Sequence, residues 1–79
     1  MVKLVEMING NLKEILVNPN QVVYVRPSAQ TFVDNNSGAP SDMTDVYINH
    51  GNGIKITVLG PAELVERKLS IATRELLKG

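Results

Sequence analysis

The sequence has no cysteine and no tryptophan, and His50 is its only histidine. No disulfide can form, and one histidine leaves almost no ligands for a structural zinc ion. The 79 residues fit one domain, residues 1–79. A domain of this size buries little apolar surface relative to the conformational entropy that it loses on folding. We therefore expect self-association to supply part of its stability.

The sequence also has no excess of positive or negative charge and no long apolar segment. Eight Lys and Arg residues balance eight Asp and Glu residues, so the chain lacks the positive field that gathers proteins on nucleic acid phosphates. The longest apolar runs are far shorter than the roughly 20 residues of a membrane span. Lys3 and Glu6 interrupt the first apolar segment, which does not fit a signal peptide. We expect a cytoplasmic protein with no nucleic acid partner and no membrane span.

Alternating side chains and turn formers predict β-hairpins from the start of the chain. A first strand carrying Val2 and Leu4 ends at Asn9-Gly10, a pair that favours a two-residue hairpin turn because both residues tolerate positive φ. A second strand follows through residues 13–17. It stops at residues 18–20, where a proline lies between two asparagines.

Proline and turn formers then interrupt the pattern. A third strand is predicted over residues 21–26, and Pro27 indicates an edge strand or a bulge, after which residues 31–33 can resume the strand. Residues 34–42 contain no apolar side chain larger than alanine and many turn formers. We expect a mobile loop over residues 34–42.

The clearest hairpin lies at residues 46–58. Val46 and Ile48 alternate with polar positions before the turn at residues 51–53, and Ile56 and Val58 alternate in the same way after it. The chain therefore predicts an α+β fold. We expect a small antiparallel β-hairpin sheet of four to five strands, with one C-terminal amphipathic helix packed on a face.

That helix is predicted over residues 61–78, with Pro61 at its first position. One apolar stripe suits packing against a sheet, and its members are Pro61, Val65, Leu69, Ala72 and Leu76. Leu64 and Ile71 fall outside the stripe and lack an obvious intramolecular partner. We therefore expect Leu64 and Ile71 to form a homo-oligomer interface.

No combination of side chains predicts catalysis or metal binding. His50 adjoins a glycine-rich turn, where a solvated histidine is the ordinary case. Residues 34–38 place glycine at the fifth position rather than the sixth that a calcium loop of the EF-hand type requires. The acidic residues suit turns, helix ends and solubility: Asp34, Asp42, Asp45, Glu63 and Glu66. We expect no enzymatic activity, no catalytic residues, no metal and no cofactor.

Strand alternation nevertheless gathers aromatic and basic side chains on one surface. It places Tyr24, Arg26, Tyr47 and Lys55 on the sheet face opposite the core. One interpretation is an ordinary solvated face. The other is a binding face, because Tyr and Arg are the residues that most often contribute interface energy. The candidate binding residues are Tyr24, Arg26, Tyr47, Asn49, His50 and Lys55.

Several short motifs follow one another along the chain in a specific order. They are Ile8-Asn9-Gly10, Leu16-Val17-Asn18, Val22 with Val25, Val46 with Ile48, Asn52-Gly53 followed by Lys55, and residues 56–58 leading into Glu63-Leu64-Val65. In this order the chain resembles the FlbD-like family of small flagellar proteins, which is related to swarming-motility proteins, over roughly residues 2 to 70. The resemblance implies a similar small fold and no catalytic or cofactor residues.

Two functions are compatible with these features. The first is a non-enzymatic protein-interaction or regulatory module that acts as a homo-oligomer and contacts a protein partner. The second is an oligomeric protein that binds or sequesters a small anionic ligand, for example a phage-encoded or bacterial binder of a nucleotide-like signal. Genes for flagellar proteins near the coding sequence would favour the first function, and phage early genes the second.

Overall fold

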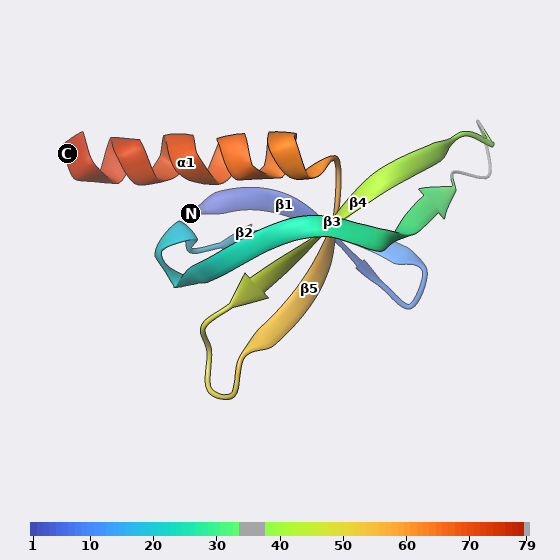
Figure 1. The fold of residues 1–79 in the computed structure, drawn as a ribbon, viewed down its shortest axis with the longest axis horizontal. Helices are drawn as coiled ribbons and strands as arrows, with labels where there is room; N and C mark the ends of the chain where they lie inside the picture. The colour runs from blue at the N-terminus through green and yellow to red at the C-terminus, as the bar shows by residue number, and fades with distance from the viewer. Residues whose placement is uncertain (34–37, 79) are drawn as a thin grey trace.

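The computed structural model describes residues 1–33 and 38–78, with the side chains of 72–78 left aside. These residues contain five strands and two helical segments. They are β1 (Val2–Ile8), β2 (Asn11–Val17), the 3₁₀ turn η1 (Pro19–Gln21), β3 (Val22–Val33), β4 (Pro40–Ile48), β5 (Ile54–Leu59) and α1 (Ala62–Lys78). The strands form one antiparallel sheet in the order β2-β1-β5-β4-β3 (Figure 1). The predicted α+β fold is confirmed.

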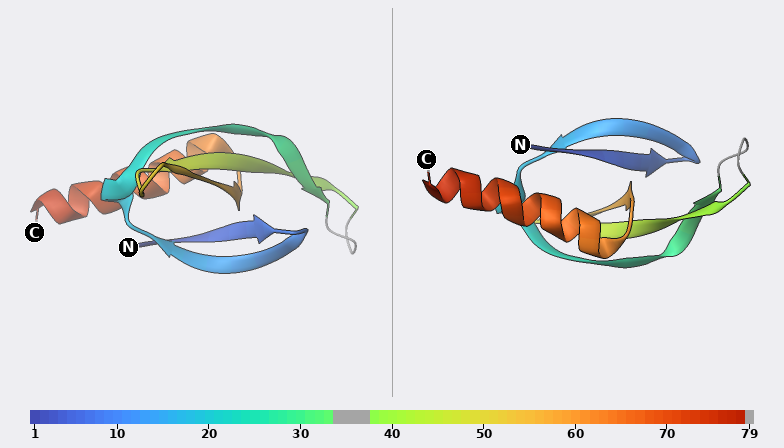
Figure 2. Two further views of the ribbon diagram at one scale, coloured as in Figure 1. Left: turned by 90° about the horizontal axis from the view of Figure 1, so that it is seen from below. Right: turned by 90° about the horizontal axis from the view of Figure 1, so that it is seen from above.

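The sheet coils strongly, so that the β1–β2 hairpin faces the β3–β4 pair (Figure 2). The only register pair that joins β1 to β5 is Glu6 with Val58. Helix α1 crosses one end of this arrangement and extends past it. The apolar core brings together β1, β2, β4, β5 and α1 through Val2, Leu4, Val17, Val46, Val58, Val65 and Leu69.

The first hairpin forms as its turn sequence predicts. Asn9 and Gly10 both have positive φ, 51° and 81°, as a two-residue turn of the hairpin type requires. The register then runs without a break from Ile8 opposite Asn11 to Val2 opposite Val17. Leu4 and Val17 point into the core, whereas Leu16 on the other side of β2 is exposed.

Strand β3 is longer than the sequence pattern indicates. It continues through Pro27 to Val33, with register shifts between Val22 and Tyr24 and between Pro27 and Thr31. Strand β3 is at the edge of the sheet, and no strand lies on its free side. The missing N–H of Pro27 therefore removes no hydrogen bond between strands on that side. The predicted edge position and bulge at Pro27 are therefore confirmed.

The loop expected over residues 34–42 is shorter than predicted. Strand β4 begins at Pro40, and Ser41 and Asp42 pair with Phe32 and Thr31. The prediction was wrong for residues 40–42 because backbone pairing with an extended β3 needs no apolar anchors in the paired strand. Residues 34–37 lie outside the described part of the chain.

The helix begins at Ala62, one residue later than predicted. Pro61 lies just before the helix and contributes only its carbonyl oxygen, which accepts hydrogen bonds from the Leu64 and Val65 N–H groups. Val65 and Leu69 are buried, as the apolar stripe predicts, but Pro61 is exposed and does not belong to the core. Leu64 is exposed, as is Ile71. The side chains of the two other stripe residues, 72 and 76, lie outside the described set.

A hydrogen bond fixes the approach to this helix. The Thr44 hydroxyl, which is completely buried, donates to the carbonyl oxygen of Gly60 at 2.8 Å. The Gly60 N–H in turn donates to the Asp42 carbonyl oxygen, also at 2.8 Å. Gly60 has φ 116°, a conformation that a residue with a side chain rarely adopts. The start of β4 thus sets the direction in which the chain enters α1.

Candidate functional site

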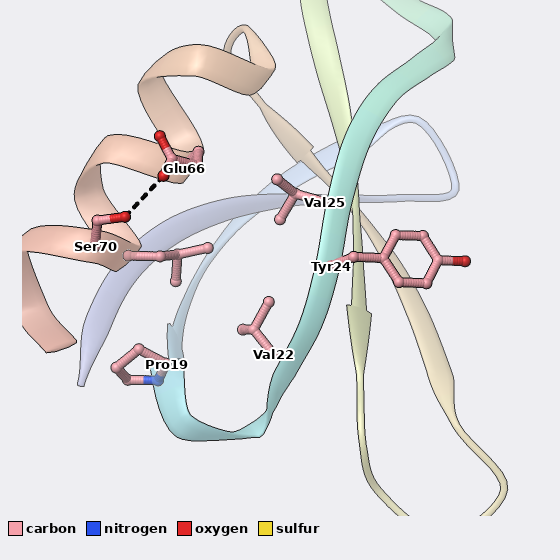
Figure 3. Close-up of a pocket in the computed structure, with 7 residues that line it drawn as sticks. Pro19, Val22, Tyr24, Val25, Glu66 and Ser70 are labelled. Carbon is pink, nitrogen blue, oxygen red and sulfur yellow. Dashed lines mark hydrogen bonds between the residues drawn. The ribbon is translucent and has the colours of Figure 1, made fainter.

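Two rows of side chains cross the face of the sheet that points away from α1. The register aligns Tyr24 with Tyr47 and Lys55, and beside them Arg26 with Asp45 and Thr57. We call these six residues the outer face. Figure 3 shows Tyr24 projecting away from the helix while Val22 and Val25 of the same strand point toward it. The side assigned to Tyr24 from strand alternation is therefore confirmed.

The tyrosines of the first row form a stacked pair. Their ring centroids are 4.2 Å apart and their planes differ by 22°. Tyr24 is 49% exposed and Tyr47 is half-buried beside it. Stacking restricts both rings without removing them from solvent, so the pair offers a rigid apolar surface with polar hydroxyl groups.

Arg26 holds the second tyrosine from the neighbouring row. Its Nη2 donates a hydrogen bond to the Tyr47 hydroxyl at 2.9 Å, and its Cζ lies 5.3 Å from the centroid of the Tyr47 ring. The guanidinium group has five N–H donors in a planar fork and is exposed. Most of its donors therefore remain free to engage an acceptor on another molecule.

A buried carboxylate lies in the same row. Asp45 is only 7% exposed although it lies on the outer face, and its Oδ1 accepts a hydrogen bond from the Thr57 hydroxyl at 3.0 Å. Asp45 lies opposite Arg26 in the register of β3 and β4, and side chains at such positions are close neighbours.

A hollow of about 520 Å³ opens beside the stacked rings, between β3 and the β4–β5 turn. Four of the predicted binding residues line it, Tyr24, Tyr47, Asn49 and Lys55. The rest of its lining is Val23, Ile48, Gly51, Asn52, Gly53 and Ile54. The surface therefore combines aromatic and aliphatic walls with one cation and two amide side chains.

The β4–β5 turn separates two of the predicted binding residues. Asn49 lines the hollow beside the tyrosines, and its backbone N–H is bonded to the Gln21 carbonyl at 2.7 Å. His50 instead lines a different, mainly apolar hollow of about 300 Å³ between β2 and the β4–β5 hairpin. The turn itself closes when the Gly53 N–H donates to the His50 carbonyl at 3.0 Å. The structure therefore groups Asn49, and not His50, with the outer face.

Another hollow, of about 400 Å³, lies on the opposite side of β3, beneath the helix (Figure 3). Its walls include Val22, Val25 and Leu69. Tyr24 also lines this hollow, and the two polar side chains that α1 contributes bond to each other, since the Ser70 hydroxyl donates to Glu66 Oε1 at 2.8 Å. This hollow has fewer uncommitted polar groups than the outer face, which remains the better candidate site.

Within residues 1–33 and 38–71, His, Asp and Glu side chains nowhere gather in a group of three that could hold a metal ion. No described helix has the length and apolar character that a membrane-spanning helix needs. Comparison with protein-family models, curated proteins and solved structures finds no match. The resemblance to the FlbD-like family therefore stays a prediction.

Strand alternation predicts most of the outer face but not how its members interact. The local sequence indicates for Asp45 only a role in turns, helix ends or solubility, and no pairing with Thr57. Strand alternation already places Asp45 on the side of Tyr47, which is the signal that could have drawn attention to it. The contact between Arg26 and Tyr47 had no sequence signal, because 21 residues separate them along the chain.

Proposed function

We propose that this chain is a small non-enzymatic interaction module whose outer face binds a protein partner. The observation that carries the proposal is the cluster of Tyr24, Tyr47 and Arg26, in which two stacked rings and a guanidinium group meet on an exposed sheet surface. Tyr and Arg dominate the residues at which truncation weakens protein interfaces most.

Preorganisation strengthens this argument. Each rotamer-rich side chain that must be immobilised on binding costs about 0.5–1.5 kcal/mol of affinity. Here Tyr47 contacts two side chains of β3, because its ring stacks with Tyr24 and its hydroxyl accepts a hydrogen bond from Arg26. Part of that ordering cost is therefore met when the chain folds, and more of the contact energy is available for binding.

Charge favours a partner with acceptor groups of its own. Arg26 and Lys55 are exposed at two corners of the outer face, whereas its acid, Asp45, is buried. The outer face is therefore locally positive although the whole chain has a formal net charge of zero. A protein surface that presents a carboxylate next to an apolar side chain would complement it.

Self-association is part of the proposal. A chain of this size without a disulfide gains stability when a second copy covers its exposed apolar side chains. Leu64 and Ile71 are exposed on α1, which supports the proposal that they contact a second copy. They lie on the helix, away from the outer face, so both contacts can exist together.

A second candidate function is binding of a small anionic ligand. The observation in its favour is the hollow of about 520 Å³ beside the tyrosines, which has the size of many small-molecule sites. A planar group could stack on Tyr24 while Lys55 neutralises an anionic group. In this function the protein would sequester a nucleotide-like signal rather than contact a protein.

Capture from an extract of the source cells tests the proposal, with Tyr24→Ala and Arg26→Ala compared with wild type. The matched control is Ile8→Ala, which truncates an exposed apolar side chain at the end of β1, outside the outer face. We expect one protein to be retained by wild type and control but lost from both outer-face variants. With that protein purified, each variant should lose about 2 kcal/mol or more of binding free energy.

Two results would count against this function. Retention of the same proteins by all variants, each shown to be folded by circular dichroism, would exclude the outer face as a protein contact. Native mass spectrometry that detects a small anion bound to wild type but not to Tyr24→Ala would favour the ligand-binding function instead. The same spectrum gives the number of subunits.

A further inference from the structure

The sheet has two edges, β2 and β3, and they differ in their capacity to pair with another strand. Strand β3 contains Pro27 and two register shifts, features that discourage pairing along an edge. Strand β2 has no proline, and all seven of its residues pair with β1 in unbroken register. Figure 2 shows β2 along the outer margin of the sheet, with no strand beyond it. Among the described strands, β2 is the edge open to pairing.

The turn at Asn9-Gly10 decides which backbone groups of β2 face outward. In a hairpin closed by two residues, the pair that flanks the turn exchanges hydrogen bonds, and bonded and non-bonded pairs then alternate. Here the flanking pair is Ile8 with Asn11. The outward N–H and C=O groups are therefore those of Leu12, Glu14 and Leu16.

We propose that β2 pairs antiparallel with β2 of a second copy of this chain, about a two-fold axis at Glu14. This axis places Leu12 opposite Leu16 of the second copy, Glu14 opposite Glu14, and Leu16 opposite Leu12. All three pairs then join residues whose backbone groups point outward, so each pair exchanges two hydrogen bonds. A shift of the axis to either neighbouring residue leaves only two such pairs.

The side chains suit this register. Leu16 is 63% exposed and Leu12 is also exposed, so each fills an uncovered apolar position opposite the other. The unfavourable feature is the approach of two Glu14 carboxylates at the axis. Each is offset within its own chain by Lys3, whose Nζ lies 3.8 Å from Glu14 Oε2. The edge is thus complementary to itself, and this identifies the occupant as a second copy.

This interface uses no residue of the outer face and does not depend on the proposed function. It also differs from the contact expected at Leu64 and Ile71, since β2 lies at one edge of the sheet and those residues lie on α1. The test must therefore distinguish a dimer formed through the β2 edge from one formed through Leu64 and Ile71.

Sedimentation of the purified full chain over a concentration series, with variants of each interface, distinguishes the two dimers. We expect wild type to dimerise and Leu16→Asp to raise the dissociation constant at least about tenfold, because two apolar pairs are lost. Val23→Asp is the matched control, since Val23 is also 63% exposed but lies on the other edge strand. It should leave the constant unchanged. A monomeric wild type, or dissociation by Leu64→Glu with Ile71→Glu but not by Leu16→Asp, would overturn the proposal.

Backbone variants test the hydrogen bonds directly. Glu14→Pro and Glu14→Ala both remove the carboxylate, but only proline also removes the outward N–H. We expect Ala to preserve or strengthen the dimer and Pro to weaken it. If Glu14→Pro does not fold, amide exchange of wild type decides. Slow exchange at Leu12, Glu14 and Leu16 that becomes fast on dilution supports the interface, and fast exchange in the dimer overturns it.

Discussion

Tyr24 and Tyr47 stack across β3 and β4 with their ring centroids 4.2 Å apart, directly opposite each other in the register. The contact joins an edge strand to its inner neighbour at a point just after a register shift. It therefore has two consequences. It stabilises the pairing of β3 with β4, and it presents a rigid aromatic surface on the outer face.

The stacked pair should contribute to stability as a coupled unit. Aromatic pairs add about 0.5–1.5 kcal/mol beyond the area that they bury. In a double-mutant cycle with Tyr24→Leu and Tyr47→Leu, we expect a coupling free energy in this range, measured by urea unfolding. The control cycle combines Tyr24→Leu with Leu64→Ala on the helix, where the effects should add. Additive effects in the tyrosine cycle would contradict an energetic contribution from stacking.

The buried hydroxyl of Thr44 should matter for the orientation of α1. Thr44→Val keeps the shape of the side chain but leaves the Gly60 carbonyl without the bond that it accepts at 2.8 Å. We expect a loss of about 1–3 kcal/mol in the free energy of unfolding, because the acceptor is partly buried. Thr31→Val, an exposed site on β3, is the control and should change stability little. Equal effects of the two substitutions would argue against this role of Thr44.

Leu64 and Leu69 of α1 should differ sharply in their effect on stability. Leu69 belongs to the core, and Leu69→Ala should cost about 2–5 kcal/mol. Leu64 is exposed, so Leu64→Ala should cost less than about 1 kcal/mol in monomeric protein. Thermal unfolding at low concentration measures both. Similar losses would mean that the helix is not packed through the face that contains Val65 and Leu69.

Local sequence signals were sufficient for the elements with a strong period or a specific turn. Asn9-Gly10 predicted the β1–β2 turn because positive φ at two successive positions is acceptable to few residue pairs. Alternation over residues 46–58 predicted the β4–β5 hairpin, and the stripe with Val65 and Leu69 predicted the buried side of α1. These features depend on residues that are close along the chain.

Elements stabilised by partners distant in the sequence were predicted less well. The start of β4 at Pro40 had no local sequence signal, because Ser41 and Asp42 extend a strand only when Phe32 and Thr31 lie opposite them. The pairing of β1 with β5 had no signal for the same reason. A polar segment next to a proline indicates a loop unless a distant strand supplies hydrogen bonds.

The sequence by itself determined the hairpins, the helix, the absence of disulfides and the side of the sheet on which Tyr24, Tyr47 and Lys55 lie, because strand and helix periods are local properties of the chain. Only the tertiary structure decided which of these side chains touch. The hydrogen bond from Arg26 to Tyr47, the hydrogen bond from Thr57 to the buried Asp45 and the separation of His50 from Asn49 all depend on register and sheet coiling. Those are set by contacts between strands far apart in sequence, which a local pattern does not encode.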